Sequence, residues 1–210
     1  MTAVARYELR SLLLTQRWVA PFLIYAAFLA ILYAGPAGPG MTAFAITAFG
    51  LIPIGAFVTR ALLHSEDDIA RQVTVAAAGS PVRVQSAALL ACAGLTAVLA
   101  VVAVAWGVVA DSVHQLPLIA GGLAIHLLFG LFGIALGAAF SRPLVTPVGP
   151  AVLGIVAGTT LALGIPVSPV AWTIRDLIHH SAAGHLAGPS AAVLVLAVAG
   201  IGASVLAASR

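Results

Sequence analysis

Lysine is absent from this sequence, and charged side chains of every kind are scarce. Nine arginines and six acidic residues make up 7% of the 210 residues. A soluble domain carries roughly 25% charged residues. Because 62% of the chain is hydrophobic and the mean hydropathy is +1.15, too little polar surface is left to cover a water-soluble globule. The composition therefore predicts an integral membrane protein.

Without lysine, the phosphate-binding loop G-x-x-x-x-G-K-[ST] cannot be present. The H-E-x-x-H pattern of an intramembrane zinc protease is also missing. Residues 67–71, Asp-Asp-Ile-Ala-Arg, lack the glycine of the D-G-x-x-A-R signature of phosphatidyl-alcohol transferases, and no downstream G-x-x-x-D follows at the required spacing. We therefore expect no catalytic residue and no enzyme activity in this chain.

Metal and nucleic-acid ligands are equally sparse. The arginines are dispersed, with no basic patch that interleaves with aromatic residues, so nucleic acid is not an expected partner. His179, His180 and His185 follow Asp176, but adjacent histidines point to different faces of a helix and no cysteine joins them. We expect solvated histidines and no metal site. Cys92 is the only cysteine, so an intrachain disulfide is excluded.

Long apolar runs are abundant. A bilayer core is spanned by about 20 apolar residues in a helix, with a range of about 17 to 25. Six runs meet or approach this length, and they predict an all-α polytopic membrane protein with six transmembrane helices. The expected spans are residues 19–34, 41–59, 84–110, 116–140, 145–165 and 190–208.

The arginines predict the orientation of these spans, because cytoplasmic loops carry an excess of positive charge. In a six-span arrangement eight of the nine arginines fall on one side, and only Arg175 falls on the other. Both termini are therefore expected in the cytoplasm. The eight are Arg6, Arg10, Arg17, Arg60, Arg71, Arg83, Arg142 and Arg210.

Residues 1–18 precede the single transmembrane domain of residues 19–210 and have a helical pattern. At 100° per residue, three arginines (Arg6, Arg10 and Arg17) fall on one strip, while Ala5, Leu9 and Leu12 lie on another side. This pattern favours an amphipathic helix at the cytoplasmic interface. An N-terminal extension of the first span is the alternative.

The connection between spans two and three, residues 63–83, is the most polar part of the chain. Ser65 precedes three acidic residues, Glu66, Asp67 and Asp68, which is typical of a capped helix start. Asp67 and Arg71 are four apart and are expected to pair, and Gly79 followed by Pro81 predicts the end. We expect a helix over residues 66–78 that shows Ile69 and Val73 on one side. So short a helix is marginal in isolation, so it is expected to dock against something.

A second short helix is expected on the external side, within residues 166–189. Ser168-Pro169 is typical of a cap and a first helical residue. Val170, Ile174, Leu177 and Ile178 then recur at helical spacing, with charged residues and histidines turned away. This pattern predicts an amphipathic helix that lies on, or dips into, the outer leaflet.

Two residues inside the spans are candidates for function. His126 lies within the fourth span, where an ionisable side chain faces protein or a water-filled cavity. A translocation-path role and a neutral imidazole bonded to a neighbouring helix both fit. Pro53 should kink the second span. Glycines spaced along the fourth to sixth spans predict close helix packing.

The arrangement resembles the permease subunits of the ABC-2 type transporter family. The opening Arg6-Tyr7-Glu8-Leu9-Arg10-Ser11-Leu12-Leu13, the six spans, the acidic loop that ends in Ala78-Gly79-Ser80-Pro81-Val82-Arg83, and the amphipathic external segment carry the resemblance over essentially the full length. The motifs are degenerate, and the chain is short for such a permease.

The resemblance implies roles for these segments. The opening helix with Arg6, Arg10 and Arg17 would be the connecting helix beside an ATPase subunit. The coupling helix that docks into this ATPase would use Ser65, Glu66, Asp67, Asp68, Ile69 and Arg71. Residues 166–189, with Trp172, Ile174 and Leu177, would cap the translocation path from outside.

The resemblance also implies a subunit composition. A second permease subunit, the same or homologous, would complete the pathway in the cell membrane. ATP and Mg²⁺ would be used by the partner ATPase, and no cofactor would be bound by this chain. Alternating access would then export a hydrophobic or amphipathic compound such as a drug, a lipid or a lipid-linked molecule. A haem-exporter-like permease, or a membrane-embedded enzyme or assembly factor without an ATPase partner, are the alternatives.

Overall fold

The computed structural model describes residues 2–35, 40–110, 115–179 and 187–209. Within these ranges the regular elements are nine α-helices and no strand, which confirms the all-α prediction for this part of the chain. The helices are α1 (Thr2–Thr15), α2 (Val19–Leu32), α3 (Gly40–Leu63), α4 (Asp68–Ala78), α5 (Pro81–Ala110), α6 (Leu116–Ala139), α7 (Val148–Gly164), α8 (Pro169–His179) and α9 (Ala187–Ala207).

Four helices are long and apolar enough to cross a membrane: α3, α5, α6 and α9. The helices α2 and α7 have 14 and 17 residues, or about 21 and 26 Å at 1.5 Å per residue, against a hydrocarbon core of about 30 Å. Each passes the same test together with a neighbour, α1 with α2 and α7 with α8, although these pairs bend by 76° and 48°. Among the described residues the chain therefore has four to six candidate spans.

The six expected spans coincide with α2, α3, α5, α6, α7 and α9, and no boundary differs by more than four residues. The largest difference is at the end of α3, which continues to Leu63. Helix α1 is shorter than expected. It ends at Thr15, and Gln16 then adopts a left-handed backbone with φ of 55°. Arg17 therefore does not lie on one helical strip with Arg6 and Arg10, and that part of the prediction is wrong.

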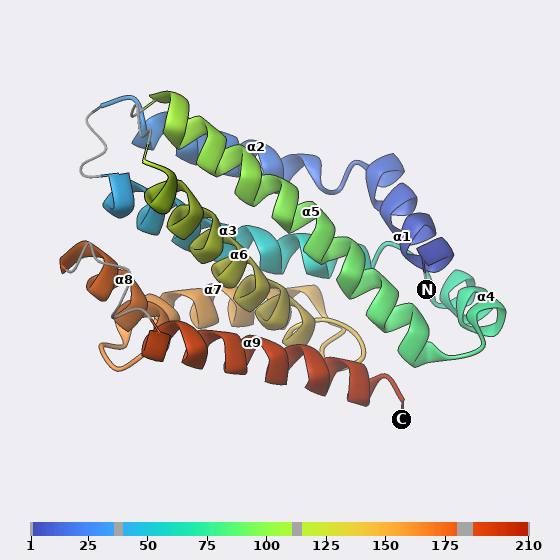
Figure 1. Ribbon diagram of the computed structural model, residues 1–210. Helices are drawn as coiled ribbons and strands as arrows, with labels where there is room; N and C mark the ends of the chain where they lie inside the picture. The colour runs from blue at the N-terminus through green and yellow to red at the C-terminus, as the bar shows by residue number, and fades with distance from the viewer. Residues whose placement is uncertain (1, 36–39, 111–114, 180–186, 210) are drawn as a thin grey trace.

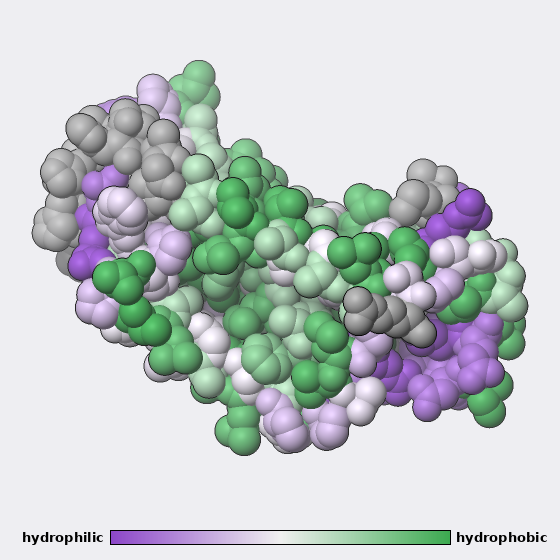
Figure 2. Space-filling view, turned by 90° about the horizontal axis from the view of Figure 1, so that it is seen from below, coloured by the Kyte–Doolittle hydropathy of each residue, from purple (hydrophilic) through white to green (hydrophobic). Residues whose placement is uncertain are grey.

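The long helices run side by side, with α3 and α6 between the α2–α5 side and the α7–α9 side (Figure 1). Helices α1 and α4 and the C-terminal end of α9 gather at one end of this bundle, while α8 lies at the other (Figure 1). We call these ends the α4 end and the α8 end. The space-filling view shows a green, apolar belt between two purple, polar ends (Figure 2). This distribution fits a bundle that crosses a bilayer along its long axis.

The centre of the bundle is the contact between α3 and α6. A Cβ placed on Gly133 would lie 2.4 Å from the carbonyl oxygen of Ile52, and one on Gly137 would lie 2.4 Å from that of Ala56. Only glycine lets the two backbones come this close, as helix association in lipid requires. The prediction of close packing through glycines is therefore confirmed at α6.

We expect Gly133→Ala and Gly137→Ala to lower the free energy of unfolding by about 1–3 kcal/mol each, because a methyl group must push α3 and α6 apart. Gly202→Ala in α9 is the matched control, since no atom lies within 4 Å of its added Cβ. Thermal unfolding in detergent measures the effect. Equal midpoints for all three variants would contradict the close α3–α6 contact.

Candidate functional site

Helix α4 stands at the α4 end of the bundle with defined caps. Asp67 is the N-cap, and its Oδ1 accepts a hydrogen bond of 2.7 Å from the backbone N–H of Ala70. The prediction of Ser65 as the cap and Glu66 as the first helical residue is wrong, because Asp67 adopts the extended backbone that a cap requires. Gly79 ends the helix with a left-handed φ of 74°, as expected.

One face of α4 is tied to the bundle by polar side chains. Asp68 Oδ1 lies 2.8 Å from Nη1 of Arg142, in the connection between α6 and α7. Arg71 Nη2 donates to Oε1 of Gln85 at 2.9 Å, so Arg71 contacts α5 instead of forming the expected pair with Asp67. Gln85 Nε2 in turn donates to Oγ of Ser204 on α9 at 3.0 Å. Helix α4 is thus connected to α5, α9 and the α6–α7 connection.

The contacts of this linkage differ in strength. The Asp68 side chain is 81% exposed, so its pair with Arg142 contributes about 0.2–1 kcal/mol. Gln85 is fully buried, and both ends of its amide are hydrogen-bonded. Removing one partner of such a buried group costs about 1–3 kcal/mol. The buried amide therefore holds α4 in place more firmly than the surface ion pair does.

The opposite face of α4 is apolar and uncovered. Ile69 and Val73, one helical turn apart, are 76% and 65% exposed. Helix α4, which carries both residues, lies at one end of the bundle (Figure 1), outside the apolar belt (Figure 2). The residues predicted for coupling thus divide into two groups. Ile69 and Asp67 are on the surface, whereas Glu66 and Arg71 are half-buried.

Helix α1 packs beside α5 and presents both predicted arginines outward. Arg6 and Arg10 are exposed, whereas Leu12 is fully buried. Glu8 is also buried, at 2% exposure, and we did not predict this. The helical pattern could have shown this, because at 100° per residue Glu8 lies within about 60° of Ala5 and of Leu12, which are on the apolar side of the helix.

Glu8 lies near two charged residues of the α3–α4 segment. Burial first, and then the negative charge of Glu66, raise the pKa of Glu8 from 4.5 to about 7, while the Arg71 charge opposes this shift. Glu66 is held in place by Thr74, whose Oγ1 donates to Glu66 Oε1 at 2.8 Å. Two carboxyl groups therefore meet where α1 contacts the segment that leads into α4.

His126 lies inside the bundle between α3 and α6 and is fully buried. Its Nδ1 donates to the carbonyl oxygen of Gly122 at 2.6 Å, because a carbonyl can only accept. Its Nε2 lies 3.0 Å from Oγ1 of Thr47 on α3. Both ring nitrogens are thus bonded, which is the geometry of an imidazole that joins two helices. A role in the translocation path remains a prediction.

The helix α8 begins at Pro169 as expected, and its apolar face is covered by protein. Val170, Ile174 and Leu177 are buried in one cluster with residues of α3, α6 and α9. This face therefore contacts the bundle interior, while Trp172 on another side is 54% exposed. Helix α8 closes the α8 end of the bundle instead of lying with its apolar face in lipid.

Among the described residues, no three histidine, cysteine or acidic side chains come together in a way that could hold a metal ion. His180 and His185 lie outside the described residues, as does Arg210. Pro53 lies within α3, which continues through it, and lines a cavity between α2, α3 and α7.

Comparison with known proteins gave no matching protein family, no matching curated protein and no matching solved structure.

We expect the contribution of Glu8 to the stability of the protein to fall as the pH rises from about 4.5 to about 7. The folded chain holds the Glu8 proton more tightly than the unfolded chain does, so deprotonation in this window favours unfolding. Below the window both states are protonated, and above it both are ionised. Glu8→Gln should flatten this decline, as measured by the thermal unfolding midpoint in detergent across this pH range.

Arg10→Gln is the control, because Arg10 is exposed on the same helix. It should keep the decline of the wild-type protein. The same slope in the Glu8→Gln variant and the wild-type protein would show that the buried carboxyl does not cause the decline.

Proposed function

We propose that this chain is the membrane-spanning permease subunit of an ABC transporter. In this proposal α4 is the coupling helix that docks onto a separate ATPase subunit. The observation that carries it is the arrangement of α4, whose polar face is linked to the bundle and whose apolar face, with Ile69 and Val73, is exposed at a polar end. An exposed apolar pair on so short a helix is explained by a partner protein that covers it.

The connections of α4 suit the transmission of movement. A displacement of α4 acts through Asp68 and Arg142 on the α6–α7 connection, and through Arg71 and Gln85 on α5 and α9. Closure of the ATPase subunits would thus move several helices of the bundle together. Alternating access requires such concerted movement of packed helices.

The proposed topology has six spans with both termini in the cytoplasm. Helices α2 and α7 are the two short spans, α1 lies at the cytoplasmic interface, and α8 closes the external end. The arginines support this orientation. Arg6, Arg10, Arg71 and Arg142 belong to segments of the α4 end, whereas Arg175 belongs to α8. Positive charge is retained on the cytoplasmic side of a membrane.

The subunit would work with three others, namely a second permease subunit and two ATPase subunits that use ATP and Mg²⁺. The exported compound would be hydrophobic or amphipathic, because the spans carry little fixed charge away from their ends. The lack of lysine fits a chain that leaves ATP hydrolysis to its partner.

The orientation can be tested with cysteine labelling. Cys92 is buried, so a Cys92→Ala background carries single cysteines at Ser209, after α9 at the α4 end, and at Val167 before α8, both of which are exposed. In intact cells a membrane-impermeant maleimide should label the Val167→Cys variant, and it should label the Ser209→Cys variant only after permeabilisation. Labelling of Ser209→Cys in intact cells would contradict the transporter proposal.

The partner can be tested by purification in mild detergent. The tagged wild-type protein should retain an ATPase with Walker motifs in a one-to-one ratio, identified by mass spectrometry and by ATP hydrolysis. Replacing Ile69 and Val73 with glutamate should reduce this recovery by about tenfold or more, because a buried charge at an interface costs several kcal/mol.

Val167→Glu is the matched control, since it places the same charge at an exposed valine of the opposite end. This variant should recover the ATPase as the wild-type protein does. Recovery of the intact wild-type protein without any ATPase would favour a membrane-embedded enzyme or assembly factor.

A further inference from the structure

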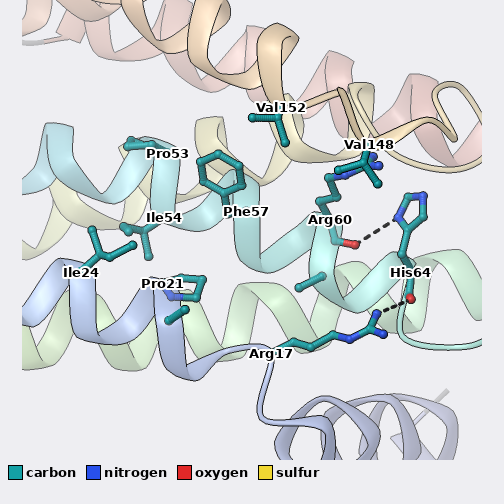
Figure 3. Close-up of a pocket in the computed structure, with 12 residues that line it drawn as sticks. Arg17, Pro21, Ile24, Pro53, Ile54, Phe57, Arg60, His64, Val148 and Val152 are labelled. Atoms are coloured by element: carbon teal, nitrogen blue, oxygen red, sulfur yellow. Dashed lines mark hydrogen bonds between the residues drawn. The ribbon is translucent and has the colours of Figure 1, made fainter. Parts of the chain in front are cut away.

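A cavity of about 560 Å³ lies between α2, α3 and α7. Figure 3 shows its apolar part, formed by Ile24 of α2, Pro53 and Phe57 of α3, and Val152 of α7. Ile24 is 64% exposed, so the cavity opens at the surface of the apolar belt. A hydrocarbon chain can therefore reach it from the surrounding bilayer.

The other part of the cavity is cationic. Arg17, Arg60 and His64 line it where α3 ends, on the side opposite Ile24 and Pro53 (Figure 3). From Pro53 to Arg60 the wall of α3 changes from apolar to charged over seven residues, or about 10 Å of helix. The cavity is thus amphipathic along its length.

Among the described residues, only backbone carbonyls accept hydrogen bonds from the Arg60 guanidinium. The side chain is only 8% exposed, and Nη1 donates to the carbonyl oxygen of Phe140 at 2.7 Å. Weaker bonds from Nη1 and Nη2 reach carbonyl oxygens over residues 145–147, at 3.2 to 3.4 Å. Carbonyl dipoles satisfy the N–H groups, but they do not supply the negative charge that normally accompanies a buried cation.

Arg17 is exposed, unlike Arg60, but its guanidinium is also bonded to a backbone carbonyl. Its Nη1 donates to the carbonyl oxygen of His64 at 2.7 Å, and none of the described residues that line the cavity is acidic. The excess of positive charge also affects the pKa of His64. Burial and then the positive charges of Arg60, Arg142 and Arg71 lower its pKa. Within the described part of the chain, the cationic part of the cavity therefore has positive charge without an acidic residue in its lining.

We propose that this cavity binds an anionic phospholipid, with its phosphate beside Arg17 and Arg60 and an acyl chain along Ile24, Phe57 and Val152. The phosphate of the lipid matches the cationic part of the cavity, and its acyl chain matches the apolar part. A small inorganic anion would leave the apolar walls uncovered, and a neutral lipid would leave two arginines without a counter-charge. This proposal does not depend on the transporter function, because it concerns the bundle alone.

The binding site can be tested with the purified full-length protein. After reconstitution in vesicles of phosphatidylglycerol and phosphatidylcholine with identical acyl chains, native mass spectrometry measures the ratio of the two lipids that stay bound. We expect phosphatidylglycerol to be enriched by about tenfold, which corresponds to one charge-assisted hydrogen bond. Equal retention of the two lipids by the wild-type protein would overturn the proposal.

Three variants locate the site. Arg17→Gln removes a charge from an exposed residue and should abolish the enrichment, whereas Arg10→Gln, an exposed arginine that lines no described cavity, should keep it. Ala61→Phe leaves every charge in place but fills the cavity, and it should reduce retention of both lipids. The same loss in Arg10→Gln and Arg17→Gln would show that net charge, and not this cavity, selects the lipid.

The free headgroup tests the need for the acyl chain. Glycerol phosphate, added at increasing concentration, should fail to displace the bound phosphatidylglycerol. Displacement at a concentration comparable to that of the lipid would show that the site is a simple anion site and would overturn the amphiphile proposal.

Discussion

The close contact of two backbones, α3 against α6, is the constraint on which the remaining packing depends. Lipid offers no hydrophobic drive for helices to associate, so contact area and close approach must supply the stability. Gly133 and Gly137 permit that approach at Ile52 and Ala56. Because one side of α3 packs against α6, another side of α3 forms a wall of the cavity between α2, α3 and α7. The same contact fixes the C-terminal end of α3, from which the chain continues into α4.

The polar residues of this protein are concentrated where helices must be joined across the ends of the bundle. At the α4 end, a buried amide at Gln85 links α4 with α9, and a carboxyl at Glu8 meets Glu66 beneath α1. Some of the few charged groups of the chain thus lie at such junctions, whereas Arg6 and Arg10 are exposed on α1. The exposed apolar side chains of Ile69 and Val73 on α4 join no helices, and they carry the proposal of a docking partner.

Much of the fold could be predicted because long apolar runs indicate the membrane helices, and local signals such as Gly79 mark the ends of helices. The exposed apolar pair of α4 was also predicted, since helical periodicity specifies faces. The cap at Asp67 was missed because Ser65 satisfies the same local rule, and only the backbone distinguishes them. The partners of Arg60 lie 80 to 87 residues further along the chain, and no local pattern encodes contacts of that kind.

The bonds of Arg60 also have a consequence for biosynthesis. The Arg60 side chain belongs to α3, but the carbonyl oxygens that accept its hydrogen bonds belong to the stretch from Phe140 to Pro147. During translation, α3 is complete long before that stretch leaves the ribosome. Until then these acceptors do not exist, so water must solvate the Arg60 guanidinium. The end of α3 therefore cannot make these bonds before residues 140–147 have been synthesised.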